Sequence, residues 1–96
     1  MTDRRLNATV RGLVQGVGFR FYVVRVAKAL RLSGTVANAR DGSVRVVAEG
    51  PEERLRELAD RLREGPSASA VKDVEIEWSD AAGAFRGFEV TFPGPE

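Results

Sequence analysis

The sequence contains neither cysteine nor histidine in its 96 residues. Without cysteine there are no disulfides, no thiolate nucleophile and no cysteine metal site. Without histidine the chain lacks the commonest metal ligand and the commonest general base. Any chemistry must therefore come from other side chains and from the backbone, and we expect neither a metal nor a cofactor.

Long apolar runs are missing as well. No segment approaches the roughly 20 consecutive apolar residues of a membrane span, and Met1 to Arg5 are not followed by the apolar core of a signal peptide. We therefore expect a cytoplasmic protein without membrane contact. The length and a hydrophobic content of 43% predict a single domain over residues 1–96. Because nothing marks an interface, we expect a monomer.

Charge is unevenly distributed although the net charge is only +1. Residues 1–48 contain nine Lys/Arg and two Asp/Glu, whereas residues 49–96 contain six Lys/Arg and twelve Asp/Glu. A positive field over the first half would attract a small anion, although scattered surface charges would produce the same counts.

The spacing of apolar residues predicts seven elements, because alternation is typical of strands and a three-to-four-residue spacing is typical of helices. In chain order they are a strand over residues 6–11, a helix over 20–32, strands over 35–38 and 43–49, a helix over 51–64, and strands over 73–78 and 88–92. We expect Gly34 to break the first helix and Asp41-Gly42 to close a hairpin.

This order, βαββαβ plus a final strand, predicts an α+β fold. We expect a ferredoxin-like α/β sandwich in which an antiparallel sheet carries both helices on one face. The large aromatic residues of the second half are expected in the core: Trp78, Phe85, Phe88 and Phe92. Residues 93–96, with two prolines, are expected to form a frayed tail.

The most informative motif is GLVQGVGFR at residues 12–20, where the first strand leads into the first helix. Gly16 and Gly18 allow a sharp turn and a close approach of the backbone to a ligand. The first amides of the helix lack intrahelical acceptors and carry partial positive charge, and Arg20 adds a planar cation that fits phosphate oxygens. The motif therefore predicts an anion-binding loop. The alternative is a tight turn followed by a surface arginine.

Asn38 ends the strand that follows the first helix, and in the expected topology this strand end approaches the loop of residues 12–20. Two interpretations are open. Asparagine tolerates unusual backbone angles and often begins turns. Alternatively, its amide both donates and accepts hydrogen bonds, and so can orient a water molecule beside an anion bound at Arg20.

Two motifs in register give the chain its resemblance to a known family. The run GLVQGVGFR is similar to the first signature of the acylphosphatase family without a mismatch, and the second signature follows at the family's distance in Gly34-Thr35-Val36-Ala37-Asn38, then Gly42, Val44 and Gly50. The resemblance covers nearly the whole chain and implies the ferredoxin-like fold. One position departs from the pattern: Thr35 stands where the family usually has an aromatic residue, which bears on substrate preference if that residue contacts the acyl group.

The resemblance implies hydrolysis of a carboxyl-phosphate anhydride, an acyl phosphate, to a carboxylate and inorganic phosphate. It also implies that Arg20 and Asn38 are the catalytic pair, with Asn38 positioning the attacking water. The phosphoryl oxygens would be bound by Arg20 and by the backbone amides of the loop: Gln15, Gly16, Val17, Gly18, Phe19 and Arg20.

So sparse a site agrees with the missing histidine and cysteine. A carboxylate leaving group is stable without protonation, so no general acid is needed, and a loose phosphoryl-transfer transition state requires little from a base. The tasks left to the protein are to position the water and to neutralise the phosphoryl oxygens. We expect the substrate phosphate to assist water deprotonation; Asp41, the carboxylate nearest to Asn38 in sequence, is the alternative base.

Two other functions fit the same fold class. RNA-binding modules of this fold stack bases on outward aromatic residues, but here the outward positions of the central strands are Asn7, Thr9, Arg11, Arg45, Val47 and Glu49, so no nucleic-acid partner is expected. The second alternative is a non-catalytic phosphate or acyl-phosphate binding module, because acylphosphatase-like domains also occur inside larger carbamoyl-transferring maturation proteins. We expect a free-standing enzyme.

Overall fold

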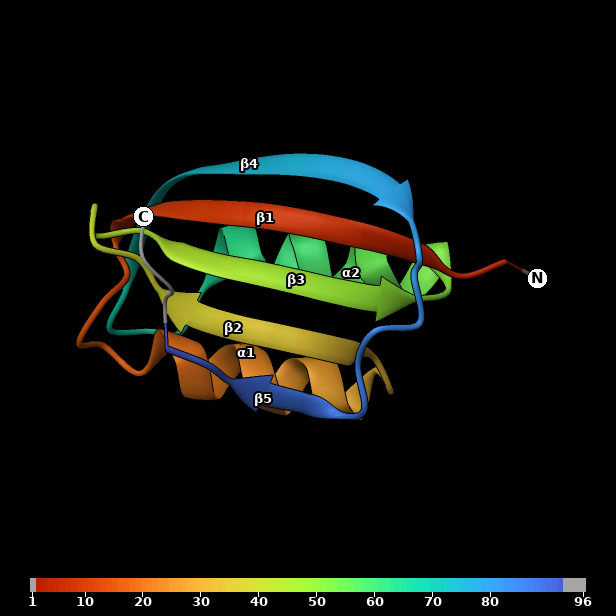
Figure 1. The fold of residues 1–96 in the computed structure, drawn as a ribbon. Helices are drawn as coiled ribbons and strands as arrows, with labels where there is room; N and C mark the ends of the chain where they lie inside the picture. The colour runs from red at the N-terminus through yellow and green to blue at the C-terminus, as the bar shows by residue number, and fades with distance from the viewer. Residues whose placement is uncertain (1, 93–96) are drawn as a thin grey trace.

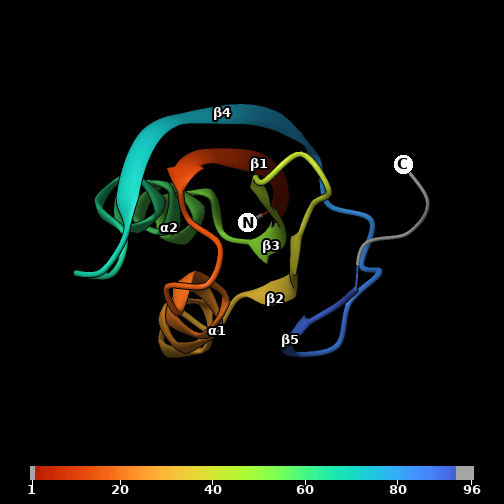
Figure 2. The same cartoon turned by 90° about the vertical axis from the view of Figure 1, so that its left-hand side faces the viewer.

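The protein is built on one five-stranded sheet, seen in a computed structural model that describes residues 2–92. Its elements are, in chain order, β1 (Arg4–Leu13), α1 (Phe19–Ala29), β2 (Ser33–Asn38), β3 (Val44–Gly50), α2 (Glu52–Glu64), β4 (Ala70–Asp80) and β5 (Phe88–Val90). The strand order across the sheet is β4-β1-β3-β2-β5. Both helices cover the same face of the sheet (Figure 1), and the other, open face carries no helix of residues 2–92, as the end-on view in Figure 2 shows.

Alternation along β1 explains why one face of the sheet is covered. Leu6, Ala8 and Val10 are buried under the helices, whereas Asn7 and Thr9 lie on the open face. The helices contribute a matching apolar stripe to the same core, formed by Phe19, Val23, Ala27, Leu55, Leu58, Ala59 and Leu62. The ferredoxin-like α+β arrangement predicted from the sequence is confirmed.

The sheet is mixed, which corrects the expectation of a wholly antiparallel sheet. Four strands pair antiparallel as expected, but β5 pairs parallel to β2, with Val36 opposite Val90. The physical reason is the path of residues 81–87: this segment leaves β4 at one edge of the sheet and starts β5 at the other edge, beside the beginning of β2 (Figure 1).

The first helix ends earlier than predicted, and not at Gly34. Arg31 has a left-handed backbone conformation (φ 57), and its amide donates to the Lys28 carbonyl while the Leu32 amide donates to the Ala27 carbonyl. These two bonds form the helix-ending motif that usually has glycine at this position. An arginine replaces that glycine here, so composition gave no signal, and Gly34 lies within β2 instead.

The predicted core position is wrong for two of the four aromatic residues. Phe88 is buried and Trp78 packs partly buried against the core, as expected. Phe85 is half-buried outside that core, with its ring 5.2 Å from the Arg5 guanidinium carbon. Phe92 is 89% exposed and lies beyond the end of β5 at Val90, where no described element covers it. The tail predicted at residues 93–96 lies outside the described residues.

Glu49 is the one open-face position of β3 that tertiary structure buries, at 4% exposure. Its carboxylate accepts hydrogen bonds from Arg5 Nε (2.8 Å) and from the backbone amides of Ala82 (2.9 Å) and Gly83 (3.0 Å). Burial acts to raise the pKa of this carboxyl, but the bonds from Ala82, Arg5 and Gly83 outweigh it and leave the pKa below its ordinary value. Glu49 therefore holds the segment that leads to β5.

Candidate active site

The turn between β1 and α1 has the backbone shape expected for an anion-binding loop. Gly16 (φ 74) and Gly18 (φ 80) both adopt left-handed conformations, and a Cβ built on either glycine would meet no atom within 4 Å. The space above them is therefore open. The first intrahelical bond of α1 runs from the Tyr22 amide to the Gly18 carbonyl (3.1 Å), so the amides before it have no intrahelical acceptor.

Gly12, the first glycine of the same motif, has a different role. It follows a shift in the pairing register between β1 and β4, and a Cβ at this position would lie 2.2 Å from the Ala70 carbonyl oxygen. Only glycine permits this approach of the two strands. Gly12 thus lets the end of β1 pair closely with the start of β4, just before the chain enters the loop.

Arg20 lies in the first turn of α1, half-buried, and forms no ion pair with any acidic side chain of residues 2–92. The opposite flank of the helix is occupied, because the Tyr22 hydroxyl donates to the Arg61 carbonyl of α2 (2.9 Å). The first turn of α1 contains no acidic residue either. The guanidinium is therefore available to an external anion.

Asn38 is the last residue of β2, where it pairs with Val44. Strand alternation places its side chain on the same face as Val36, the face covered by the helices. Its Oδ1 atom is buried and accepts no hydrogen bond within the described chain. A buried acceptor without a partner destabilises a fold by about 1 to 3 kcal/mol, so this oxygen marks a place that a donor such as water can fill.

The topology brings Asn38 to the loop. β1 and β2 both run antiparallel to β3, so both end at the same end of the sheet. Figure 2 looks onto this end, with the loop in orange beside the yellow-green turn between β2 and β3. A direct link joins them, because Gln15 Nε2 donates to the carbonyls of Ala39 (2.7 Å) and Ser43 (2.9 Å). Sequence reasoning assigned Gln15 only a backbone amide and missed this side chain.

Asp41, the alternative base, is engaged in the turn between β2 and β3. Its Oδ1 accepts hydrogen bonds from the Ser43 hydroxyl (2.6 Å) and the Ser43 amide (2.9 Å). These bonds hold the pKa of the Asp41 carboxyl below its ordinary value. A carboxylate so occupied keeps the turn in shape and is a poor proton acceptor.

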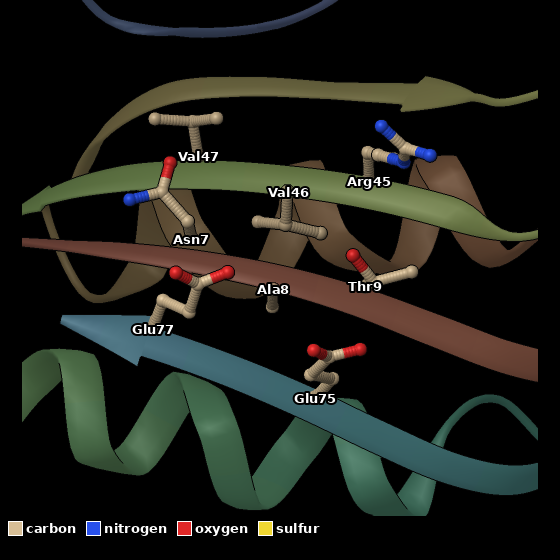
Figure 3. Close-up of a pocket in the computed structure, with 8 residues that line it drawn as sticks. All are labelled: Asn7, Ala8, Thr9, Arg45, Val46, Val47, Glu75 and Glu77. Carbon is tan, nitrogen blue, oxygen red and sulfur yellow. The ribbon is translucent and has the colours of Figure 1, made fainter.

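The open sheet face carries a hollow of about 370 Å³ that no residue of the loop lines. Figure 3 shows its lining from β1, β3 and β4, with Asn7, Thr9, Arg45, Glu75 and Glu77 among the labelled side chains. The lining residues among 2–92 are polar, charged or small apolar side chains, and none is aromatic. Within residues 2–92, no cluster of three or more acidic side chains is placed to hold a metal ion, and no helix is long and apolar enough to cross a membrane.

Comparison with known proteins identifies similar chains over nearly the whole length. The profile of the acylphosphatase family matches residues 6–90. An acylphosphatase from Salinibacter ruber is 48% identical over 89 residues, which are 93% of this chain and 94% of that relative. The crystal structure of an acylphosphatase from Bacillus subtilis superposes with a TM-score of 0.88 at 34% identity, covering 92% of this chain and 98% of that one. The structure of T. kodakarensis HypF matches 95% of this chain (TM-score 0.81, 29% identity), but only 12% of its own length is covered.

Proposed function

This chain belongs to the acylphosphatase family, and from that premise we propose that the loop of residues 15–20 and Asn38 form its active site. As a family member it is an enzyme that hydrolyses acyl phosphates, with a small-molecule acyl phosphate as substrate and inorganic phosphate as product. The alternative of a non-catalytic binding module is not favoured, since the chain spans nearly all of the acylphosphatase relative and a small part of HypF.

The phosphoryl group binds in the arch of the loop in this proposal. The backbone amides of residues 15–20 donate to its oxygens, and Arg20 contributes a bidentate, charge-assisted contact. The observation that carries the assignment is the open left-handed arch at Gly16 and Gly18, which leads directly into Arg20, a residue without an ion pair among residues 2–92.

The Asn38 side chain holds the attacking water. Two observations support this role: the buried Oδ1 accepts no hydrogen bond from the described residues, and β2 ends at the same end of the sheet as β1. A water that donates to Oδ1 keeps a lone pair for attack on phosphorus, in line with the departing carboxylate. The carboxylate leaves as a stable anion, so no protein acid takes part, and the proton of the water passes to a phosphoryl oxygen of the substrate.

We also propose a cytoplasmic monomer with one domain over residues 1–96 and no nucleic-acid partner. This part rests on the sequence: the chain contains no cysteine, no residue pattern marks an interface, and the outward positions of the central strands carry no aromatic residues.

The site is tested by hydrolysis of benzoyl phosphate, with and without a chelator, and with inorganic phosphate as a competitive inhibitor. We expect turnover that the chelator does not change, and inhibition by phosphate that depends on Arg20. Phosphate inhibition that survives in Arg20→Gln would contradict the assignment of the loop.

A further inference from the structure

We propose that the Gln15 side chain is a positioning residue, which holds Asn38 at the correct distance from the phosphate loop. The inference rests on the roles proposed above for Arg20 and Asn38. It concerns the side-chain amide of Gln15, in addition to the backbone amide that the loop contributes.

The geometry of the Gln15 amide carries the proposal. Nε2 lies 2.7 Å from the Ala39 carbonyl oxygen and 2.9 Å from the Ser43 carbonyl oxygen. Carbonyl oxygens only accept, so both protons of one NH2 group are used, and the orientation of the amide is determined. The two acceptors flank the turn that joins β2 to β3, and Ala39 directly follows Asn38.

The turn does not need Gln15 to close. The Ala39 amide donates to the Ser43 carbonyl (2.8 Å), and the Gly42 amide donates to the Ala39 carbonyl (3.2 Å). Asp41 adds its own bonds to Ser43. Gln15 therefore uses the second lone pair of two carbonyls that already have a partner within the turn, and what it adds is the connection to the loop.

This connection lies out of bulk water. Ala39 is 5% exposed, Ser43 is 2% exposed and Gln15 is half-buried. Hydrogen bonds shielded in this way are stronger than exposed ones. Among the described residues, these are the hydrogen bonds that join residues 14–18 to the turn of residues 39–43.

A small displacement at this connection matters for the reaction. The loop would hold the phosphorus atom, whereas Asn38 would hold the water, so their separation sets the attack distance. An error of 1 Å in such a geometry reduces the rate by about a hundredfold. The Gln15 side chain connects the loop to the residue directly after Asn38, and so links the two halves of the site.

The test replaces Gln15 by methionine, which has a similar length and no donor. We expect kcat on benzoyl phosphate to fall by about ten- to a hundredfold, whereas the inhibition constant of inorganic phosphate stays within about threefold, because Arg20 and the loop amides remain. A rise in that constant equal to the fall in kcat would overturn the proposal, since Gln15 would then shape the phosphate cradle.

A double-mutant cycle with Asn38→Ala shows whether Gln15 acts through Asn38. In the Asn38→Ala background we expect Gln15→Met to lower kcat by no more than about twofold, because the group it positions is already missing. Effects that multiply would overturn the inference. If Asn38→Ala alone leaves kcat unchanged, the proposed function fails and the inference fails with it; if Asn38→Ala lowers kcat and Gln15→Met does not, only the inference fails.

Tyr22→Phe is the matched control. It also removes a side-chain hydrogen bond to a backbone carbonyl, but that bond joins α1 to α2 and not the loop to the turn beside Asn38. We expect it to lower the melting temperature without changing kcat.

Gln15→Asn is the milder second variant, should the methionine variant not fold. Its side chain is one methylene shorter, so its amide reaches at most one of the two carbonyls. Its kcat should lie between those of wild type and Gln15→Met, and a wild-type kcat in a folded Gln15→Asn would overturn the proposal.

Discussion

The two ends of the sheet differ in whether an arginine is ion-paired. At one end Arg20 has no ion-pair partner among the described residues, and Asn38 Oδ1, at the same end of the sheet, is buried and accepts no hydrogen bond from them. At the other end Arg5 bonds to the buried Glu49, whose two oxygens also accept two backbone amides. At the first end the Arg20 guanidinium and Asn38 Oδ1 have no partner among the described residues, whereas at the second end Arg5 and Glu49 pair with each other.

This difference shows how a small fold separates binding from stability. Unpaired buried polar groups destabilise a protein, and they persist where a ligand supplies the missing partner. Satisfied groups, in contrast, hold a segment in place. Substitutions at the loop end should therefore lower activity, and substitutions at the Glu49 end should lower stability. The opposite pattern would contradict this comparison.

The largest expected effect is that of Arg20→Gln. The loss of two charge-assisted bonds of about 1.5 to 3 kcal/mol each should lower kcat/KM on benzoyl phosphate by at least about a hundredfold. Phosphate inhibition should disappear with it. Because Arg20 has no ion pair to lose among residues 2–92, the melting temperature should stay within about 2 °C of wild type.

Arg5→Gln is the counterpart at the other end. It should lower the melting temperature and leave kcat/KM within about twofold, since its partner Glu49 lies far from the loop. A loss of activity in a folded Arg5→Gln would contradict the separation of the two ends.

Asn38→Ala should lower kcat by about ten- to a hundredfold, with little change in the inhibition constant of phosphate, because an oriented water matters more in the transition state than in the product complex. Its unfolding free energy should equal or exceed that of wild type, since an unpaired buried oxygen is removed. Steady-state kinetics and denaturant melts on the same preparation check both parts. Marked destabilisation would show that Oδ1 has a structural role.

Glu49→Gln should reduce the unfolding free energy by about 1 to 3 kcal/mol, because the amide replaces one acceptor by a donor that faces the backbone amides and the Arg5 guanidinium. Activity measured below the melting transition should stay close to wild type. Thermal melts decide the first part, and an unchanged melting temperature would mean that the segment over residues 81–87 is held by other contacts.

The smallest effect is the pH dependence of the same contact. The pKa of Glu49 is lowered from its ordinary value of 4.5 in the folded protein, so its contribution to stability is fully present above that value and is lost as the pH falls through the folded pKa. The difference in unfolding free energy between wild type and Glu49→Gln should therefore shrink below about pH 4.5. Subtracting the variant removes the parallel contributions of Asp41 and Glu52, whose pKa values are also lowered. A difference that grows on acidification would contradict this direction.

Local residue chemistry was enough to predict much of the candidate site. Glycines at two left-handed positions, an arginine in the first turn of a helix and an asparagine at a strand end are signals within short segments. The roles of Arg20 and Asn38 themselves stay predictions. Gln15 could not be recognised in the same way, because its acceptors are backbone carbonyls 24 and 28 residues away. Every residue has a backbone carbonyl, so residue identity does not indicate which carbonyls will accept these bonds.

The amino-acid sequence alone determined the order of elements, the apolar face of each strand and the family resemblance, because these depend on periodicity and on local backbone preferences. Only the tertiary structure decided that β5 runs parallel at the far edge, that Glu49 is buried while Phe92 is exposed, and that the loop is fastened to the turn beside Asn38. Each of these depends on which distant segments come into contact. The alternation of polar and apolar residues within a strand does not reveal this, because it is the same whether or not a later segment covers the strand.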